Sequence, residues 1–139
     1  AQRLRTEMTL LFSVPDPPVL FEGKVDALVE DAQGHLHLLD FKTGRHNPEA
    51  EREYRLQLGL YCAAVQSVGT GNLDSATIVY LSDAGLELAR CDPVSTAREA
   101  LDRGLEAVRG IRRGSFGKVS DERCTLCRLR WACEGRELV

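Results

Sequence analysis

Two carboxylates and a lysine lie at spacings that could hold a metal ion beside a reacting phosphate. Asp26 belongs to one apolar-rich stretch, and Asp40 and Lys42 belong to the next. Asp40 and Lys42 are two positions apart, so a strand would present them on one face. Mg²⁺ binds through one or two carboxylates and keeps its other sites for water and phosphate. The nearby lysine could orient or deprotonate a water and stabilise charge developing on the phosphate.

The turn between the two stretches sets the register of these residues. Ala32-Gln33-Gly34 is a three-residue connection with glycine last, which is typical of a type I turn closed by a left-handed residue. It places Asp31 opposite His35, so that Asp26 falls opposite Asp40. Opposed carboxylates repel each other, and a shared cation would offset that cost. The alternative is a solvent-facing pair of strands with scattered charges.

Hydrophobic periodicity predicts one α/β domain over residues 1–139, with a cysteine-bearing tail over residues 114–139. Asp92 and Pro93 offer a helix N-cap followed by proline at the first helical position. The predicted strands span residues 8–14, 19–30, 36–43, 76–81 and 86–91, and the predicted helices span residues 49–68 and 93–113.

The charge of the chain is unevenly distributed. Residues 1–97 carry 8 Lys/Arg against 14 Asp/Glu, a net charge of -6, and residues 98–139 carry 10 against 7, a net charge of +3. A cationic C-terminal third would suit a nucleic-acid partner, although solvated helix faces explain it equally well. The sequence has no apolar run long enough for a membrane span and no signal-peptide pattern, so we expect a cytoplasmic protein without a membrane partner.

Three of the five cysteines lie close together near the C-terminus, at Cys124, Cys127 and Cys133. A secreted disulfide framework would normally use an even number of cysteines spread along the chain. The spacing instead favours metal ligation, although it is one ligand short of a four-thiolate site. Cys62 and Cys91 fall among core positions and are expected to be small buried hydrophobes.

Three short motifs, taken in order, resemble those of RecB-like nucleases of the PD-(D/E)xK type. They are Gly-Lys-Val-Asp at 23–26, Asp-Phe-Lys-Thr-Gly at 40–44, and Gln57 with Tyr61. This group includes the nuclease domains of AddAB-type helicase–nucleases and the CRISPR-associated RecB-like exonucleases. The resemblance covers residues 7–133, and its specificity lies in the order and spacing of the motifs.

The resemblance implies a fold, a metal and a set of site residues. The expected fold is a restriction-endonuclease-like core with a central mixed sheet flanked by helices. The expected metal is Mg²⁺ or Mn²⁺, bound by Asp26, Asp40 and the Phe41 carbonyl oxygen. Gln57 and Tyr61 are implied to support the active site and contact DNA. The alternative for this pair is a boundary glutamine and a packed tyrosine.

The resemblance also gives the cysteine tail a role. In related nucleases such a tail supplies three ligands of a [4Fe–4S] cluster, which here would be Cys124, Cys127 and Cys133, with a fourth cysteine from upstream. A zinc site is the second possibility, and three free thiols are the third.

The implied activity is metal-dependent hydrolysis of DNA in repair or recombination, as a single-strand exonuclease next to a helicase domain or subunit. The alternatives are a CRISPR-associated exonuclease, a DNA-binding module with an incomplete nuclease site, and a zinc-stabilised interaction domain. The family's further His or Glu ligand, on an upstream helix, has no counterpart before Thr6, and Glu7 is a poor substitute. We therefore expect the C-terminal fragment of a larger protein, with little activity alone.

Overall fold

A computed structural model describes most of the chain as two units, residues 1–108 and 109–139. The boundary between the units falls within the last helix. The described residues are 3–69, 71–115, 117, 124, 125, 127, 128 and 130.

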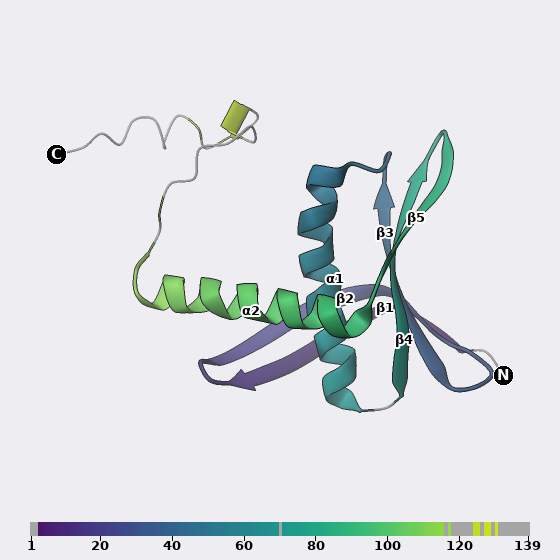
Figure 1. Cartoon of the computed structure of the whole chain (residues 1–139), viewed down its shortest axis with the longest axis horizontal. Coiled ribbons are helices and arrows are strands. Elements are labelled where there is room, and N and C mark those ends of the chain that lie inside the picture. Colours follow the sequence, from purple (N-terminus) through teal and green to yellow (C-terminus); the bar gives the residue numbers. More distant parts are fainter. Residues whose placement is uncertain are drawn as a thin grey trace. The chain divides into compact units, whose positions relative to one another are not determined.

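The first unit is built on a five-stranded sheet with strand order β1-β2-β3-β4-β5 (Figure 1). All neighbouring strands are antiparallel except β3 and β4, which are parallel and joined by the crossover helix α1. The predicted α/β fold with a mixed sheet and flanking helices is therefore confirmed. The elements are β1 (Arg3–Pro15), β2 (Pro18–Glu30), β3 (His35–Thr43), α1 (Pro48–Val68), β4 (Asn72–Ser82), β5 (Gly85–Cys91) and α2 (Pro93–Arg112).

Two strands begin earlier than the apolar pattern predicts. β1 starts at Arg3 rather than Met8, and β4 starts at Asn72 rather than Ala76. The added residues of β1 are mostly exposed, because this strand lies at one edge of the sheet. Their side chains are mostly polar, so alternation of apolar residues does not reveal them, whereas backbone pairing with β2 continues to Arg3↔Glu30.

The turn between β2 and β3 confirms the predicted register. Gly34 has φ 84°, and the Asp31 backbone N–H donates to the His35 carbonyl at 2.9 Å. The Asp31 carboxylate accepts the backbone N–H groups of Gln33 at 2.8 Å and of His35 at 2.9 Å, which fixes the turn. The strands then pair in the predicted alignment as far as Ala27↔Leu39, but the predicted direct pairing of Asp26 with Asp40 does not form, because the ladder ends one residue earlier.

Helix α1 has a well-defined start and end. Asn47 is its N-cap and accepts the Glu49 backbone N–H at 2.9 Å, with Pro48 at the first helical position. Gly69 ends it in the left-handed conformation, with φ 66°.

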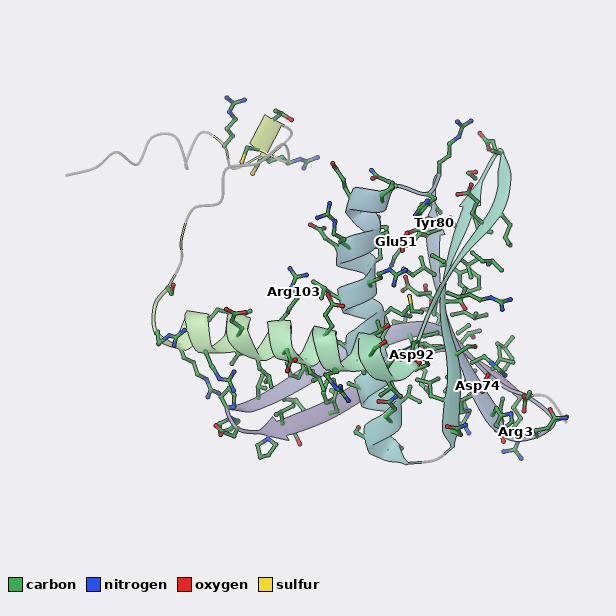
Figure 2. All side chains as sticks on the ribbon, viewed as in Figure 1. Arg3, Glu51, Asp74, Tyr80, Asp92 and Arg103 are labelled. Carbon is green, nitrogen blue, oxygen red and sulfur yellow. The ribbon has the colours of Figure 1, made fainter. Side chains whose placement is uncertain are left out.

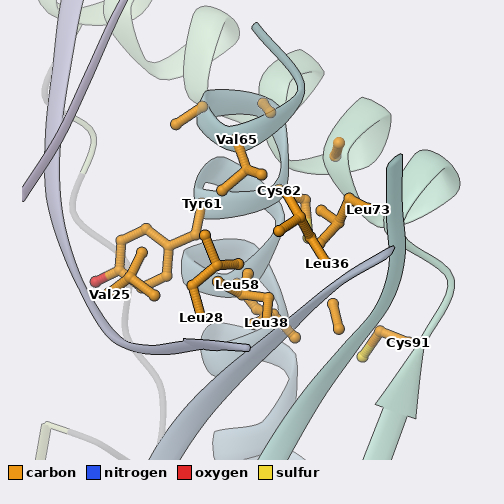
Figure 3. Packing of buried hydrophobic residues seen from close by; sticks show 14 of the residues in the cluster. Val25, Leu28, Leu36, Leu38, Leu58, Tyr61, Cys62, Val65, Leu73 and Cys91 are labelled. Atoms are coloured by element: carbon orange, nitrogen blue, oxygen red, sulfur yellow. The ribbon is translucent and has the colours of Figure 1, made fainter. Parts of the chain in front are cut away.

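The buried face of α1 packs on the sheet. The helix contacts β1, β2 and β4, and its fully buried side chains include Leu58 and Cys62 (Figure 3). On the sheet they join Val25, Leu38 and Ile78, each at most 1% exposed. Burial of such side chains stabilises the fold by roughly 1.5–3 kcal/mol each, so this layer fixes where α1 lies over the strands.

Helix α2 begins as the sequence predicts, directly after β5. The Asp92 side chain accepts the Ser95 backbone N–H at 2.8 Å, and Pro93 is the first helical residue (Figure 2). The start of α2 crosses α1 at Gly59. A Cβ atom on Gly59 would lie 2.4 Å from the Thr96 carbonyl oxygen and 2.5 Å from the Ala100 Cβ, so only glycine permits this approach. Within the described ranges, neither helix is both long and apolar enough to cross a membrane.

Substitution of Gly59 by alanine should therefore destabilise the protein by about 1–3 kcal/mol, because the added methyl group meets a backbone oxygen that cannot move freely. This loss should exceed the gain of up to about 1 kcal/mol from the better helix propensity of alanine. Urea denaturation measures the change. Gly110→Ala is the control, since its Cβ would meet only the Ser115 carbonyl oxygen at 3.9 Å. Equal stability of the two variants would contradict the close crossing.

Candidate active site

Asp40 is the most buried charged residue of the described chain, with 2% of its surface exposed. It lies in the middle of β3 and faces the same side as the core residue Leu38, because the two are two positions apart. Burial raises the pKa of the Asp40 carboxyl, Lys42 opposes that rise, and the nearby Asp26 carboxylate adds to it. A carboxylate in this position is expensive to ionise without a cation beside it.

Asp26 lies at a local interruption of the sheet. The β1–β2 pairing passes from Thr6↔Ala27 to Met8↔Val25, and the β2–β3 pairing ends at Ala27↔Leu39, so Asp26 takes part in neither. Its carboxylate instead accepts the Phe41 backbone N–H at 2.8 Å. This bond bridges the two strands where their backbone ladder stops and places the Asp26 carboxylate next to Asp40.

The interruption coincides with an unusual backbone conformation in β1. Glu7 has φ 56°, a region that residues other than glycine seldom occupy. Its side chain is exposed and forms an ion pair with Lys24 on β2. Glu7 thus marks the point at which β1 leaves regular pairing, and its carboxylate is engaged by a lysine.

Lys42 is held by three neighbours. Its Nζ lies 2.6 Å from Asp40 Oδ2 and donates to Gln57 Oε1 at 2.9 Å. The ammonium group also lies 4.7 Å from the centre of the Tyr54 ring, a cation–π contact. With 17% of its side chain exposed, Lys42 is a positioned charge rather than a mobile surface lysine.

Gln57 and Tyr61 extend this chain of contacts along α1. Gln57 Nε2 donates to the Tyr61 hydroxyl at 2.8 Å, while Gln57 Oε1 accepts from Lys42. Tyr61 is 8% exposed and belongs to the core cluster. The structure therefore brings Asp26, Asp40, Lys42, Gln57 and Tyr61 together on the α1 side of the sheet. Gln57 is the link between the charged group and the packed tyrosine.

A second group of side chains packs beside Lys42. The sequence motifs do not include these residues. Tyr54 stands between Lys42 and Tyr80, with the two tyrosine ring centres 6.4 Å apart. His46 packs edge-on against Tyr80, with the ring centres 5.1 Å apart, and hydrogen-bonds Glu51. Tyr80 and Glu51 are labelled in Figure 2. The signal available was helical spacing, since Tyr54 lies three positions before Gln57 on α1.

The carboxylates fit a divalent cation. Asp40 Oδ2 is buried and accepts no well-aligned hydrogen bond from the described residues, its contact with Lys42 being an ion pair. One Asp26 oxygen is occupied by the Phe41 N–H, which leaves the other for a ligand. Within the described ranges, no third His, Cys, Asp or Glu joins them. This donor set would suit Mg²⁺, which accepts few protein ligands and keeps water.

The histidines lie outside this group of residues. His37 lies on the face of β3 opposite to Asp40, hydrogen-bonds Ser75 Oγ at 2.8 Å and lies 3.3 Å from Asp31. His35 also approaches Asp31, and His46 follows the turn after β3. His37 therefore ties β3 to β4 rather than forming part of the site.

The cysteines divide into buried and tail positions. Cys62 and Cys91 are 0% and 7% exposed, and burial raises the pKa of the Cys62 thiol to about 12, so both are buried hydrophobes as predicted. In the second unit the Cys127 backbone N–H donates to the Cys124 carbonyl at 3.4 Å, which places these two residues in one tight turn. Cys133 lies outside the described residues.

The raised pKa of Asp40 gives a stability prediction. Because the folded-state pKa lies above the ordinary value of 3.8, the contribution of Asp40 to stability is present below pH 3.8 and is lost as pH rises through the raised pKa. At pH 7 in EDTA, Asp40→Asn should therefore be more stable than the wild type, and the difference should shrink as the pH falls. Thermal unfolding across pH measures this.

Metal binding should make the wild type more stable than the Asp40→Asn variant. A ligand at about 100 times its Kd adds about 2.7 kcal/mol, so Mg²⁺ or Mn²⁺ should raise the Tm of the wild type but not of Asp40→Asn. Asp74→Asn, at an exposed carboxylate of β4, serves as control. An Asp40→Asn variant that is no more stable than the wild type in EDTA would contradict the cost assigned to this carboxylate.

Comparisons with known proteins identify relatives of this chain. The chain is 41% identical over 86 residues to a protein of Pelotomaculum thermopropionicum that is named as a subunit of an ATP-dependent helicase/nuclease. It is 39% identical over 69 residues to the protein of the same name in Moorella thermoacetica. These alignments cover 59% and 50% of this chain but only 6% and 5% of the relatives. The chain thus spans a small part of their length.

Solved structures share the fold. The SSO0001 structure matches with a TM-score of 0.65 at 15% identity, covering 98% of this chain and 62% of that one. A candidate exonuclease from Eubacterium rectale matches with a TM-score of 0.62 at 16% identity, covering 97% of this chain and 53% of that one. The family model of the PD-(D/E)XK nuclease superfamily matches residues 2–134, nearly the whole chain. The chain therefore belongs to the PD-(D/E)XK nuclease superfamily.

Proposed function

We propose that this nuclease domain hydrolyses phosphodiester bonds of DNA with Mg²⁺ or Mn²⁺, acting on single strands as an exonuclease. The observation that carries the proposal is the line of contacts from the buried Asp40 carboxylate through Lys42 to Gln57. A DNA-binding module needs none of these groups buried or paired. A hydrolytic site needs a cation held by carboxylates and a positive charge directed at the phosphate.

In this site Asp26, Asp40 and the Phe41 carbonyl oxygen would hold the divalent ion. When bound, the ion supplies Lewis-acid stabilisation of the phosphate and lowers the pKa of a coordinated water. Asp26 accepts the Phe41 N–H and so fixes the backbone that carries that carbonyl.

Lys42 has the role of orienting the attacking water and stabilising negative charge on the phosphate. Its ammonium group is held near Asp40 by Gln57 and Tyr54, so it keeps its position without a substrate. A charge that is already in place costs no reorganisation when the reaction begins. Gln57 and Tyr61 support this position from α1, since each donates or accepts a hydrogen bond in the same line.

The relatives suggest the setting of the reaction. Both are named as part of an ATP-dependent helicase/nuclease, and this chain matches a small part of each. We infer that the domain works next to a helicase motor in DNA repair or recombination and receives a single strand from it.

Replacement of Asp40 or Lys42 by alanine tests the proposal. In a form of the protein that degrades labelled single-stranded DNA, each variant should lower kcat by on the order of 10²–10³-fold or more. Asp40→Ala removes a ligand of the proposed metal ion, and Lys42→Ala removes the positive charge directed at the phosphate. DNA binding should persist, since backbone contacts to DNA come from other cationic residues. Asp74→Ala is a matched control at an exposed position. Undiminished cleavage by Asp40→Ala or Lys42→Ala would exclude the assigned roles.

We further propose that Cys124, Cys127 and Cys133 are three ligands of a [4Fe–4S] cluster. The tight turn at Cys124 and Cys127 supports shared ligation, and the fourth iron would need another ligand. Zinc is the competing metal.

Anaerobic purification of a longer protein that supplies the fourth cysteine tests this assignment. We expect iron and sulfide in equal amounts, and loss of both when any of the three cysteines is replaced by serine. The Cys62→Ser variant, at a core position, should keep its iron. Stoichiometric zinc without iron would show that the tail is a zinc site.

A further inference from the structure

A groove opens beside the proposed catalytic residues, between α1 and the β1–β2 hairpin. It has a volume of about 230 Å³. Gln57 and Tyr61 form one wall, so the groove begins where the line of contacts from Lys42 ends. The other lining residues are Leu10, Phe12, Phe21, Glu22, Gly23, Leu60 and Ala64.

The lining is aromatic and apolar, with few polar atoms. Phe12 and Phe21 stack with ring centres 4.9 Å apart and planes inclined by 13°. Both phenylalanines are only partly buried, which leaves ring surface open to a ligand. Gln57 is the hydrogen-bonding side chain of the lining, with the Tyr61 hydroxyl already bound to it, whereas Glu22 pairs with Leu11 and its side chain lies on the exposed face of β2.

The charge of the lining restricts what could bind. Among the described residues no Lys or Arg lines the groove, so its lining offers no positive charge to a phosphate. A flat, neutral, aromatic group with hydrogen-bonding edges matches these walls. In single-stranded nucleic acid that group is the base, which proteins bind by stacking on aromatic side chains.

The backbone of β2 leaves room for the Tyr61 ring. A Cβ atom on Gly23 would lie 2.5 Å from Tyr61 Cε1, so a side chain there would push the tyrosine ring away. In Figure 3 the Tyr61 ring extends from α1 toward the strand that carries Val25, and the tyrosine is one of the residues that line the groove. The bare backbone at Gly23 thus allows Tyr61 both to contact Gln57 and to line the groove.

We propose that this groove binds a base of the DNA strand next to the scissile phosphate. The inference rests on the proposed nuclease function and adds a base subsite to it. Gln57 couples the two places, because its carbonyl oxygen holds Lys42 and its side chain borders the groove. A base seated there would keep the neighbouring phosphate close to Lys42 and Asp40. Stacking tolerates every base, so the subsite would act without sequence preference.

The test compares removal of one base from the DNA strand with removal of the Phe12 ring from the groove. Single-stranded oligonucleotides carrying one abasic nucleotide at successive positions are given to the form of the protein that degrades single-stranded DNA. They are cleaved by its wild type and by Phe12→Leu, which keeps the apolar wall but removes a ring. We expect one abasic position to raise KM by on the order of 10-fold for the wild type. Phe12→Leu should raise KM similarly on the intact strand, and the two changes should not add. Leu11→Ala, at an outward-facing position of the same strand, should have no effect.

A binding measurement accompanies the kinetics and needs no cleavage. An oligonucleotide with a single 2-aminopurine, titrated in EDTA, should lose fluorescence on binding at the responding position. This quenching should be weaker in Phe12→Leu and unchanged in Leu11→Ala. Additive effects of the abasic position and Phe12→Leu, or no responding position, would overturn the base subsite. If Asp40→Ala still abolishes cleavage in that case, the nuclease function stands and only the subsite fails.

Discussion

The arrangement of the site depends on one carboxylate placed where water cannot solvate it. Asp40 is 2% exposed in the central strand of the sheet, and burial raises the pKa of its carboxyl. Lys42 is the nearest compensation, two positions further along the same strand. Asp26 adds a second negative charge beside this pair, and the proposed divalent ion would offset it. The core is well packed here, but the charges of the buried carboxylates make this part of it unsuited to a purely structural role.

Helix α1 positions the side chains that surround Asp40 and Lys42. Its caps at Asn47 and Gly69 fix its length, and its packing through Leu58 on the sheet fixes its rotation. In that rotation Tyr54 and Gln57 meet the Lys42 ammonium group. The contacts that define the site therefore lie along the edge of the buried face of the same helix, since Tyr54 and Leu58 are one turn apart and Tyr61 belongs to the core. The start of α2, which crosses α1 at Gly59, also helps to hold α1 in place.

The sequence predicts the part of the site that local geometry controls. The turn at residues 32–34 sets the β2–β3 register, and strand alternation puts Asp40 and Lys42 on one face. It does not predict the end of the ladder after Ala27, or the bond from the Phe41 N–H to Asp26, because both depend on how β1 and β2 bend together near Glu7. The Tyr54 contact and the groove were also missed. They require the distance and rotation of α1 over the sheet, which spacing along the chain does not encode.

Gln57 shows why the proposed chemistry and binding would be hard to separate. Its side chain is exposed, yet both ends of its amide are used, one by Lys42 and the other by Tyr61. A ligand in the adjoining groove would contact a residue that already holds the catalytic charge. Any shift of the Gln57 amide would change the position of the Lys42 ammonium group, since a hydrogen bond of 2.9 Å allows little change in distance. The position of the strand and the position of the positive charge would then be set by the same side chain.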